Sequence, residues 1–234
     1  MILLFETAVS EIIQRTSNVK SFRFPKPSSL SYKAGQFLLI TIKAGDQKLE
    51  KHFSFSSSPT ERDHIEFTKK LTGHEFSNAL DVMKVGDWAE IDAPYGSFTF
   101  EGEYEKLLLL SGGIGITPLI SICKYCTDKQ LNTKITLLYG NRTEQDIAFR
   151  KELEEMQKKN RNIRVVFTLD EPGVGWTGLT GRIDAAVIMK EVPDYMGRVF
   201  YTCGPPGMIQ VMDGMLEGLK IPQERIRTES FAGY

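Results

Sequence analysis

Cysteine is scarce in this sequence, and neither sign of charge dominates it. The 234 residues include three cysteines, Cys123, Cys126 and Cys203, and carry a formal net charge of -1. A low, odd cysteine count argues against a disulfide scaffold and is typical of a reducing compartment, so we expect a cytoplasmic protein. The lack of a basic excess argues against nucleic-acid binding. Cys123 and Cys126 form a C-x-x-C, but zinc and iron–sulfur sites need about four ligands, so we predict core packing and no metal site.

Long apolar runs are also missing. The most apolar stretch, 107–123, is interrupted by three glycines and a proline, which argues against a membrane span. The first residues, Met1 to Glu6, contain no basic residue, and we expect no signal peptide. Hydrophobic residues nevertheless make up 41% of the chain and charged residues 25%, which is typical of a globular protein with a sizeable core.

Two patterns of hydrophobicity divide the chain near residue 102. Before it, short segments such as 19–24, 52–56 and 88–93 alternate apolar and polar residues between clusters of Pro, Gly, Ser and Asp. This pattern predicts an antiparallel barrel or sandwich, with one helix over 77–84.

After residue 102, short apolar segments alternate with helical stretches. The expected strands are 107–110, 135–139, 163–168 and 198–202, and the expected helices include 143–159 and 206–219. Strands that alternate with helices indicate a parallel, doubly wound sheet.

A glycine-rich turn, Ser111 to Pro118, lies between the first buried strand of this second part and a helix. Glycines let the backbone turn sharply and let a phosphate approach the peptide N–H groups at the helix N-terminus. Thr117 is expected to cap this helix, and Pro118 suits its first turn. The turn therefore predicts a pyrophosphate site, with a purely structural turn as the alternative. The usual G-x-G-x-x-G fingerprint is absent, and Asn141 and Arg142 stand where an acidic residue would follow the next strand.

Three separated motifs resemble those of the ferredoxin–NADP reductase superfamily. Residues 112–118 match G-G-x-G-x-T-P, residues 203–208 match C-G-P-P-G-M, and residues 138–147 are also similar. The resemblance implies an N-terminal antiparallel β-barrel that binds FAD, or alternatively FMN, over residues 1–102, and a C-terminal α/β domain that binds NADP or NAD over residues 103–234. The dinucleotide-binding residues that it implies are Gly112, Gly113, Gly115, Thr117, Pro118, Asn141, Arg142, Cys203, Gly204 and Pro205.

The flavin motif of the family, R-x-Y-S-x-x-S, is matched with two departures. Lys51 replaces the arginine, so a bidentate fork toward the flavin phosphate becomes a single point charge, and Phe53 replaces the tyrosine. Residues 73–78 resemble the family's G-x-x-x-S-N segment, in which Ser77 is expected to cap a helix. On their own these segments read as an amphipathic strand and a helix N-cap. The implied flavin-binding residues are Lys51, His52, Phe53, Ser54, Phe67, Thr68, Lys69, Gly73, Phe76, Ser77 and Asn78.

The resemblance also implies three catalytic residues. Ser54 is expected near the reactive edge of the flavin, Cys203 near the nicotinamide, and Glu229 in proton and electron transfer at the flavin. Phe231 and Tyr234 are candidates to cover the flavin face. Without the family, Cys203 would be an ordinary buried thiol and the last residues a frayed terminus.

Arg142 is expected near the adenosine ribose. An arginine there can pair with the 2′-phosphate of NADP, so the sequence favours NADPH. The alternatives are an exposed loop charge or packing on the adenine.

Three functions fit these features. The first is an NAD(P)H oxidoreductase with bound FAD that passes electrons to a one-electron acceptor protein such as ferredoxin, flavodoxin or an oxygenase component. The second is a flavin reductase that releases reduced free flavin, which the Lys51 departure favours. The third is a non-catalytic electron-transfer subunit of a larger complex. Relatives with an iron–sulfur cluster carry a cysteine-rich extension that is not found here, so we expect any cluster to belong to a partner.

Overall fold

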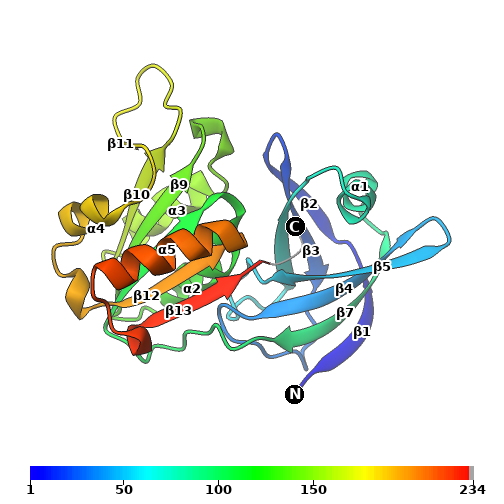
Figure 1. Cartoon of the computed structure of the whole chain (residues 1–234). Coiled ribbons are helices and arrows are strands. Elements are labelled where there is room, and N and C mark those ends of the chain that lie inside the picture. The colour runs from blue at the N-terminus through cyan, green and yellow to red at the C-terminus, as the bar shows by residue number, and fades with distance from the viewer. Residues whose placement is uncertain (232–234) are drawn as a thin grey trace.

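The computed structural model describes residues 1–231, which form a β-rich half and an α/β half side by side (Figure 1). Seven strands of the β-rich half pair in two antiparallel sheets. The four-stranded sheet has the order β1 (Leu3–Ala8), β7 (Trp88–Tyr95), β4 (Phe37–Ala44) and β5 (Gln47–Ser54), and the three-stranded sheet has the order β2 (Glu11–Thr16), β3 (Val19–Pro25) and β6 (His64–Lys70).

The predicted antiparallel fold is confirmed, but hydrogen bonds among residues 1–231 do not close it into one barrel. A loop over residues 57–63 separates β5 from β6, and an isolated bridge between Phe55 and Phe67 links the two sheets. Stacked aromatic rings fill the space between them: the ring centroids of Phe53 and Phe67 are 4.7 Å apart, and those of Phe22 and Phe67 are 5.3 Å apart. Aromatic pairs of this kind stabilise a core beyond their buried area.

One helix, α1 (Glu75–Val82), covers the end of this half with Phe76 and Leu80 buried. It begins two residues before the predicted helix, so Ser77 lies inside it and the expectation that Ser77 caps it is wrong. The N-cap is His74, which makes no side-chain capping hydrogen bond, and Ser77 Oγ instead accepts from the backbone N–H of Thr72 at 3.3 Å.

The α/β half is a six-stranded parallel sheet with helices on both faces, as the doubly wound prediction requires. Its order is β11 (Leu179–Thr180), β10 (Ile163–Leu169), β9 (Lys134–Asn141), β8 (Lys106–Gly112), β12 (Val199–Gly204) and β13 (Ile226–Ser230). Leu107 and Leu109 pack in the core with α2 (Ile116–Asp128) and α3 (Arg150–Lys159), whereas Leu108 and Leu110 pack with α4 (Ala185–Glu191) and α5 (Pro206–Gly218). This alternation follows from the two-residue period of a strand.

Two helix starts differ from the predictions. Thr117 is the second residue of α2, whose N-cap is Gly115, so the predicted Thr117 cap is wrong, whereas Pro118 does lie in the first turn. The predicted helix 143–159 is divided, because Phe149 has a left-handed φ of 61° immediately before α3. Four short 3₁₀ helices complete the secondary structure: η1 (Gly113–Gly115), η2 (Glu144–Asp146), η3 (Tyr195–Gly197) and η4 (Gln223–Arg225).

One apolar cluster spans both halves, beside a separate core in the β-rich half and another on the α4 and α5 face of the parallel sheet. Val19, Ala34, Phe98 and Phe100 of the β-rich half belong to the same buried cluster as the α2 face of the parallel sheet. The Tyr201 hydroxyl donates to the Thr99 carbonyl at 2.8 Å, across this junction. The division of the chain at residue 102 stays a prediction. No helix among residues 1–231 combines the length and apolar character that a membrane crossing requires.

Candidate active site

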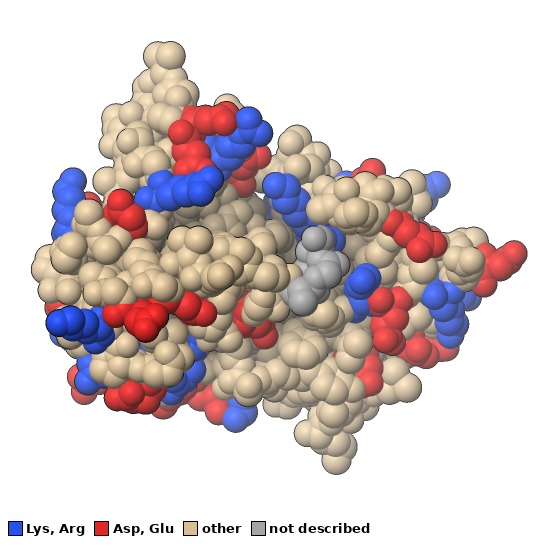
Figure 2. All heavy atoms as spheres, in the orientation of Figure 1, with Lys and Arg blue, Asp and Glu red and all other residues tan. Residues whose placement is uncertain are grey.

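A pocket of about 770 Å³ opens at the carboxyl ends of the central parallel strands. Strands β9, β10 and β11 lie on one side of β8, and β12 and β13 lie on the other, so the chain changes direction between β8 and β12. Ligands bind at this switch point in open α/β sheets. Figure 2 shows the molecule hollowed between its two halves, with charged side chains of both signs around the hollow. Asn18, Val19 and Lys70 of the β-rich half also line the pocket.

The glycines of the glycine-rich turn have two roles, since two of them line the pocket and another packs against β12. Gly112 and Gly113 line the pocket, and Gly113 has a φ of 51°. Gly115 is buried instead, and a Cβ atom there would lie 2.1 Å from the Cys203 carbonyl oxygen, so only glycine allows the turn to reach β12. The Tyr139 hydroxyl, from β9, donates to the Gly113 carbonyl at 2.9 Å and so supports the turn. The sequence placed this tyrosine in the similar segment 138–147 but indicated no contact with the glycine-rich turn.

Two buried polar side chains beside the turn suit a polar ligand. The Ser111 hydroxyl is fully buried, lines the pocket and has no hydrogen-bond partner among residues 1–231. Asn141 also lines the pocket, and its amide lies near the Tyr139 hydroxyl, but no amide atom forms a full hydrogen bond with the described residues. Buried polar groups are normally satisfied, so these two fit the phosphates or ribose of a bound dinucleotide.

The rim at the far end of this pocket carries charges of both signs. Arg142 Nε lies 2.9 Å from Glu171 Oε1, and both side chains are largely exposed. Asp170 and Arg182 line the pocket beside them, with 4.0 Å between the Arg182 Nε and Asp170 Oδ2 atoms. Arg142 therefore lies where the sequence predicted it, but its guanidinium is paired. The two acidic residues follow β10, one strand beyond the position that the sequence reasoning considered.

The other predicted dinucleotide residues lie behind this pocket. Within the described chain they support the turn and do not line the cavity. Thr117 and Pro118 are buried in the first turn of α2, and Gly204 and Pro205 connect β12 to α5.

A second pocket, of about 410 Å³, lies in the β-rich half between β5, the end of β6 and the start of α1. It brings together five of the predicted flavin residues, Lys51, Phe53, Lys69, Phe76 and Ser77. Burial and the neighbouring Lys51 ammonium lower the pKa of Lys69 to about 8. Two cations that repel each other in a half-buried pocket favour an anion between them, which fits a flavin phosphate. The pocket residues that the sequence did not predict are Leu49, Glu50, Thr72, His74 and Glu75.

Several predicted flavin residues have structural contacts instead. The Thr68 hydroxyl is hydrogen-bonded to the Ser21 and Ser56 hydroxyls at 2.6 Å and 2.8 Å, and Phe67 lies in the aromatic stack. His52 packs at 5.6 Å on the Phe37 ring. Gly73, with a φ of 77°, and Asn78 close the turn before α1, because Asn78 Nδ2 donates to the Gly73 carbonyl at 2.9 Å. None of these residues is part of the described pocket lining.

The three predicted catalytic residues meet at the junction between the halves. Ser54 ends β5, Cys203 lies near the end of β12, and Glu229 lies on β13, which runs toward the junction (Figure 1). The Ser54 hydroxyl donates to Glu229 Oε2 at 3.5 Å, and the Cys203 sulfur lies 4.0 Å from the same oxygen. Residues from three distant parts of the sequence therefore share one carboxylate.

Burial dominates the electrostatics of this group. It raises the pKa of Glu229 to about 7, which the Ser54 hydrogen bond partly opposes. Burial, with a smaller contribution from Glu229, raises the pKa of the Cys203 thiol far above its usual range. The thiol is therefore neutral, and Glu229 can gain or lose a proton near neutral pH. Phe231 is buried beside the group, its N–H donating to the Gly204 carbonyl at 3.0 Å, whereas Tyr234 lies outside the described residues.

Comparisons with known proteins agree with this geometry. Residues 6–100 match the oxidoreductase FAD-binding domain, and residues 109–213 match the oxidoreductase NAD-binding domain. The glycine betaine monooxygenase reductase subunit of Chromohalobacter salexigens is 29% identical over 229 residues, which are 94% of this chain. This chain spans 62% of the length of that relative.

Two further likenesses cover more of the other protein. NADH-cytochrome b5 reductase 1 of Dictyostelium discoideum is 30% identical over 218 residues, which are 90% of this chain and 76% of that protein. The crystal structure of the cytochrome b5 reductase domain of Ulva prolifera nitrate reductase superposes with a TM-score of 0.84 and 25% identity, over 97% of both chains. The protein therefore belongs to the ferredoxin–NADP reductase-like superfamily of NAD(P)H-dependent flavoprotein oxidoreductases, with FAD and a nicotinamide dinucleotide as its cofactors.

Proposed function

We propose that this chain oxidises a nicotinamide dinucleotide and passes the electrons, through bound FAD, to a one-electron acceptor protein. The observation that carries the proposal is the meeting of Ser54, Cys203 and Glu229 at the junction of the two halves. Bound FAD supplies the redox chemistry, since a flavin takes up two electrons together and returns them singly. The chain itself has to bind the two cofactors, exclude water and transfer one proton.

Glu229 is suited to the proton. At a pKa of about 7 its carboxyl is partly protonated at neutral pH, and its hydrogen bond to Ser54 gives the proton a defined path to the Ser54 hydroxyl. Cys203 would present a small, neutral and buried side chain to the nicotinamide end of the dinucleotide. Phe231, which is also buried, directly follows β13 and donates its N–H to the carbonyl of Gly204, the residue after Cys203.

We propose NADH as the preferred dinucleotide. Asp170 and Glu171 lie at the pocket rim, where carboxylates can accept hydrogen bonds from ribose hydroxyls and repel a 2′-phosphate. The Arg142 guanidinium, which favoured NADPH in the sequence, is neutralised by its ion pair with Glu171.

The acceptor is proposed as a protein component of an oxygenase or a related one-electron carrier. The names of two relatives support this choice, since one is the reductase subunit of a monooxygenase and the other is a cytochrome b5 reductase. Lys51 and Lys69 both line the flavin pocket, so two cations are available there for the flavin phosphate, which supports a retained flavin over a released one.

An anaerobic titration tests the proposal. The purified protein is passed through a gel-filtration column, its flavin content is measured, and it is then titrated with NADH and with NADPH. We expect one FAD per chain and loss of the flavin absorbance band with NADH. Flavin that leaves the protein on the column would favour the flavin reductase, and a band that neither dinucleotide bleaches would favour the non-catalytic subunit.

A further inference from the structure

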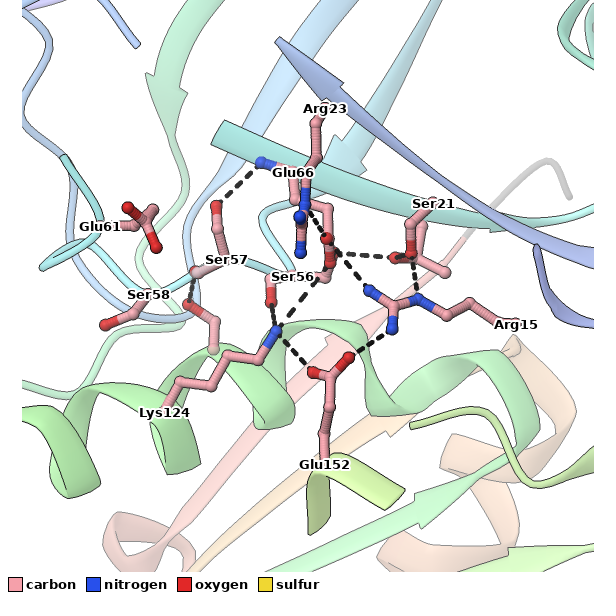
Figure 3. A network of polar contacts seen from close by, with 12 residues as sticks. Arg15, Ser21, Arg23, Ser56, Ser57, Ser58, Glu61, Glu66, Lys124 and Glu152 are labelled. Atoms are coloured by element: carbon pink, nitrogen blue, oxygen red, sulfur yellow. Dashed lines mark hydrogen bonds and ion pairs between the residues drawn. The ribbon is translucent and has the colours of Figure 1, made fainter. Parts of the chain in front are cut away.

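A cluster of charged side chains, of which one is buried and four are partly exposed, lies between the two halves and outside both pockets (Figure 3). We call Arg15, Arg23, Glu66, Lys124 and Glu152 the junction cluster. At its centre the Glu66 side chain, on β6, is only 1% exposed. Its Oε2 lies 3.1 Å from Arg15 Nη2 and 2.8 Å from Arg23 Nε, and its Oε1 lies 4.0 Å from Lys124 Nζ.

The α/β half supplies two members of the cluster, from two helices. Lys124 on α2 reaches Glu152 Oε2 on α3 at 3.0 Å and also donates to the backbone carbonyl of Ser56 at 2.9 Å. Glu152 forms a second ion pair with Arg15 of β2. The Arg15 guanidinium also lies 4.6 Å above the Phe149 ring, just before α3. Both helices are therefore connected to the β-rich half by charged side chains.

The connected segments lead directly to the two cofactor sites. Ser56 lies two residues after Ser54, and its hydroxyl donates to Glu66 Oε1 at 2.9 Å. Helix α2 begins at the glycine-rich turn, and Lys124 projects from the same helix. One lysine thus links the dinucleotide turn to the strand that carries the flavin-side serine.

Net stability is a poor explanation for such a cluster. Buried ion pairs gain little over well-packed apolar residues, because both charges lose their hydration. Their directional geometry matters more: another orientation of the two halves would break the Arg15–Glu152 ion pair and the hydrogen bond from Lys124 to the Ser56 carbonyl. The apolar part of the junction, which includes Val19, Phe98 and Phe100, does not discriminate in this way, since apolar burial is not directional.

We propose that Lys124 and Glu152 are positioning residues for hydride transfer, because they fix α2 and α3 to the strands of the flavin site. The inference rests on the proposed function. In that reaction a hydride leaves the reduced dinucleotide, which is oxidised by two electrons, and the flavin gains the hydride and a proton. The reacting atoms must approach within roughly 3–3.5 Å, and a misplacement of about 1 Å can slow such a step by about 100-fold.

The test compares Lys124→Met and Glu152→Gln with two matched controls. Glu155→Gln and Lys158→Met remove the same charges from exposed positions of α3 that are outside the cluster. For each protein, stopped-flow spectroscopy gives the rate constant of flavin reduction at saturating NADH and the dissociation constant of NADH, and the bound FAD is counted separately. We expect Lys124→Met to reduce the rate constant about 10-fold, with FAD content and NADH affinity within about twofold of wild type.

Two further expectations separate positioning from simple stabilisation. Glu152→Gln, at a side chain that is 31% exposed, should show a smaller loss of the same kind, and Lys124→Arg should restore most of the rate. Unchanged reduction rates in Lys124→Met and Glu152→Gln would overturn the inference. A parallel loss of FAD, affinity and rate would overturn it as well, because that pattern reports damage to the fold. If NADH does not reduce even the wild-type flavin, the proposed function fails first and the inference fails with it.

Discussion

The two cofactor pockets are built in different ways. The dinucleotide pocket relies on backbone at the glycine-rich turn, where Gly112 and Gly113 line it at the end of β8. The flavin pocket is formed by side chains, among them Lys51 and Lys69, that come from separate strands and from α1. A backbone site tolerates little change because its geometry needs glycine at fixed places. A side-chain site can exchange one cation for another, as Lys51 stands in place of the arginine of the family motif, and keep a positive charge in the pocket.

The first prediction introduces a steric clash at the glycine-rich turn of the dinucleotide pocket. Gly115→Ala places a Cβ atom 2.1 Å from the Cys203 carbonyl oxygen, so the turn must move away from β12. We expect the free energy of unfolding to fall by about 2 kcal/mol or more and NADH binding to be lost, with FAD still bound. Chemical denaturation and NADH titration measure both effects. Gly214→Ala, in α5, has no atom within 4 Å of its new Cβ and is the control.

The second prediction removes cations from the side-chain site. Lys51→Met and Lys69→Met should each weaken FAD binding by about 10- to 100-fold, and the double variant by more, because each deletes a charge-assisted contact worth about 1.5–3 kcal/mol. Flavin fluorescence during reconstitution measures the dissociation constant, with the exposed Lys84→Met as the control. A double variant that holds FAD as tightly as wild type would show that these lysines do not bind the phosphate.

The flavin pocket should also respond to pH. The pKa of Lys69 is about 8 in the free protein, and a bound phosphate would raise it. Lys69 must therefore take up a proton on binding once the pH exceeds 8, so FAD affinity should decline above that pH. Lys69→Met should flatten this decline.

The third prediction concerns the acid between the two pockets. Because burial raises the pKa of Glu229 to about 7, the folded protein binds its proton more tightly than the unfolded chain does. This contribution to stability is fully present below the unfolded pKa and is lost as the pH rises through 7. Relative to Glu229→Gln, wild type should lose on the order of 2 kcal/mol between pH 5 and pH 8. Denaturation curves at both pH values measure the difference, and parallel curves would contradict the assigned burial.

The fourth prediction alters the rim of the dinucleotide pocket. Glu171→Gln releases the Arg142 guanidinium from its ion pair and removes a carboxylate that would repel a 2′-phosphate. We expect kcat/KM for NADPH to rise about 5- to 10-fold, with a small decrease for NADH. Steady-state kinetics with both dinucleotides provide the ratio. The double variant Glu171→Gln/Arg142→Ala should lose the gain if Arg142 is the group that binds the phosphate.

The fifth and smallest effect is expected at Tyr139. Tyr139→Phe deletes the hydrogen bond to the Gly113 carbonyl and keeps the ring. A neutral hydrogen bond is worth about 1 kcal/mol, so KM for NADH should rise about fivefold with kcat and FAD content unchanged. An equal fall in kcat would show that the tyrosine affects the reacting end of the dinucleotide and not only the turn.

The contrast between the pockets also explains what the sequence could predict. Gly112 and Gly113 were identified because a turn of this kind requires glycine, wherever the rest of the chain lies. The sequence did not identify three other residues of the flavin pocket, Glu50, Thr72 and Glu75. They line it only because of the register of the strands and the residue at which α1 begins. Local propensity predicts such positions only to within a few residues. The caps assigned to Ser77 and Thr117 failed for the same reason, since each helix begins earlier than expected.

No local sequence pattern could have predicted the junction cluster. Arg15 and Glu152 are 137 residues apart, and each is an ordinary charged residue in its own segment. The three predicted catalytic residues are just as scattered, with Ser54 and Glu229 175 positions apart, yet the resemblance to a family pointed to them. Family motifs can indicate residues that are far apart in the sequence and meet in the fold, whereas periodicity and composition cannot.

Strand β13 has a consequence for the order in which the protein is made. Among residues 1–231 it is the last strand in chain order, and it pairs with β12 at the edge of the parallel sheet, so Glu229 leaves the ribosome after every residue that lines the two pockets. A nascent chain can therefore complete the lining of both pockets before Glu229 is synthesised. Docking of this edge strand then brings the Glu229 carboxylate to Ser54 and Cys203 at the junction of the two halves.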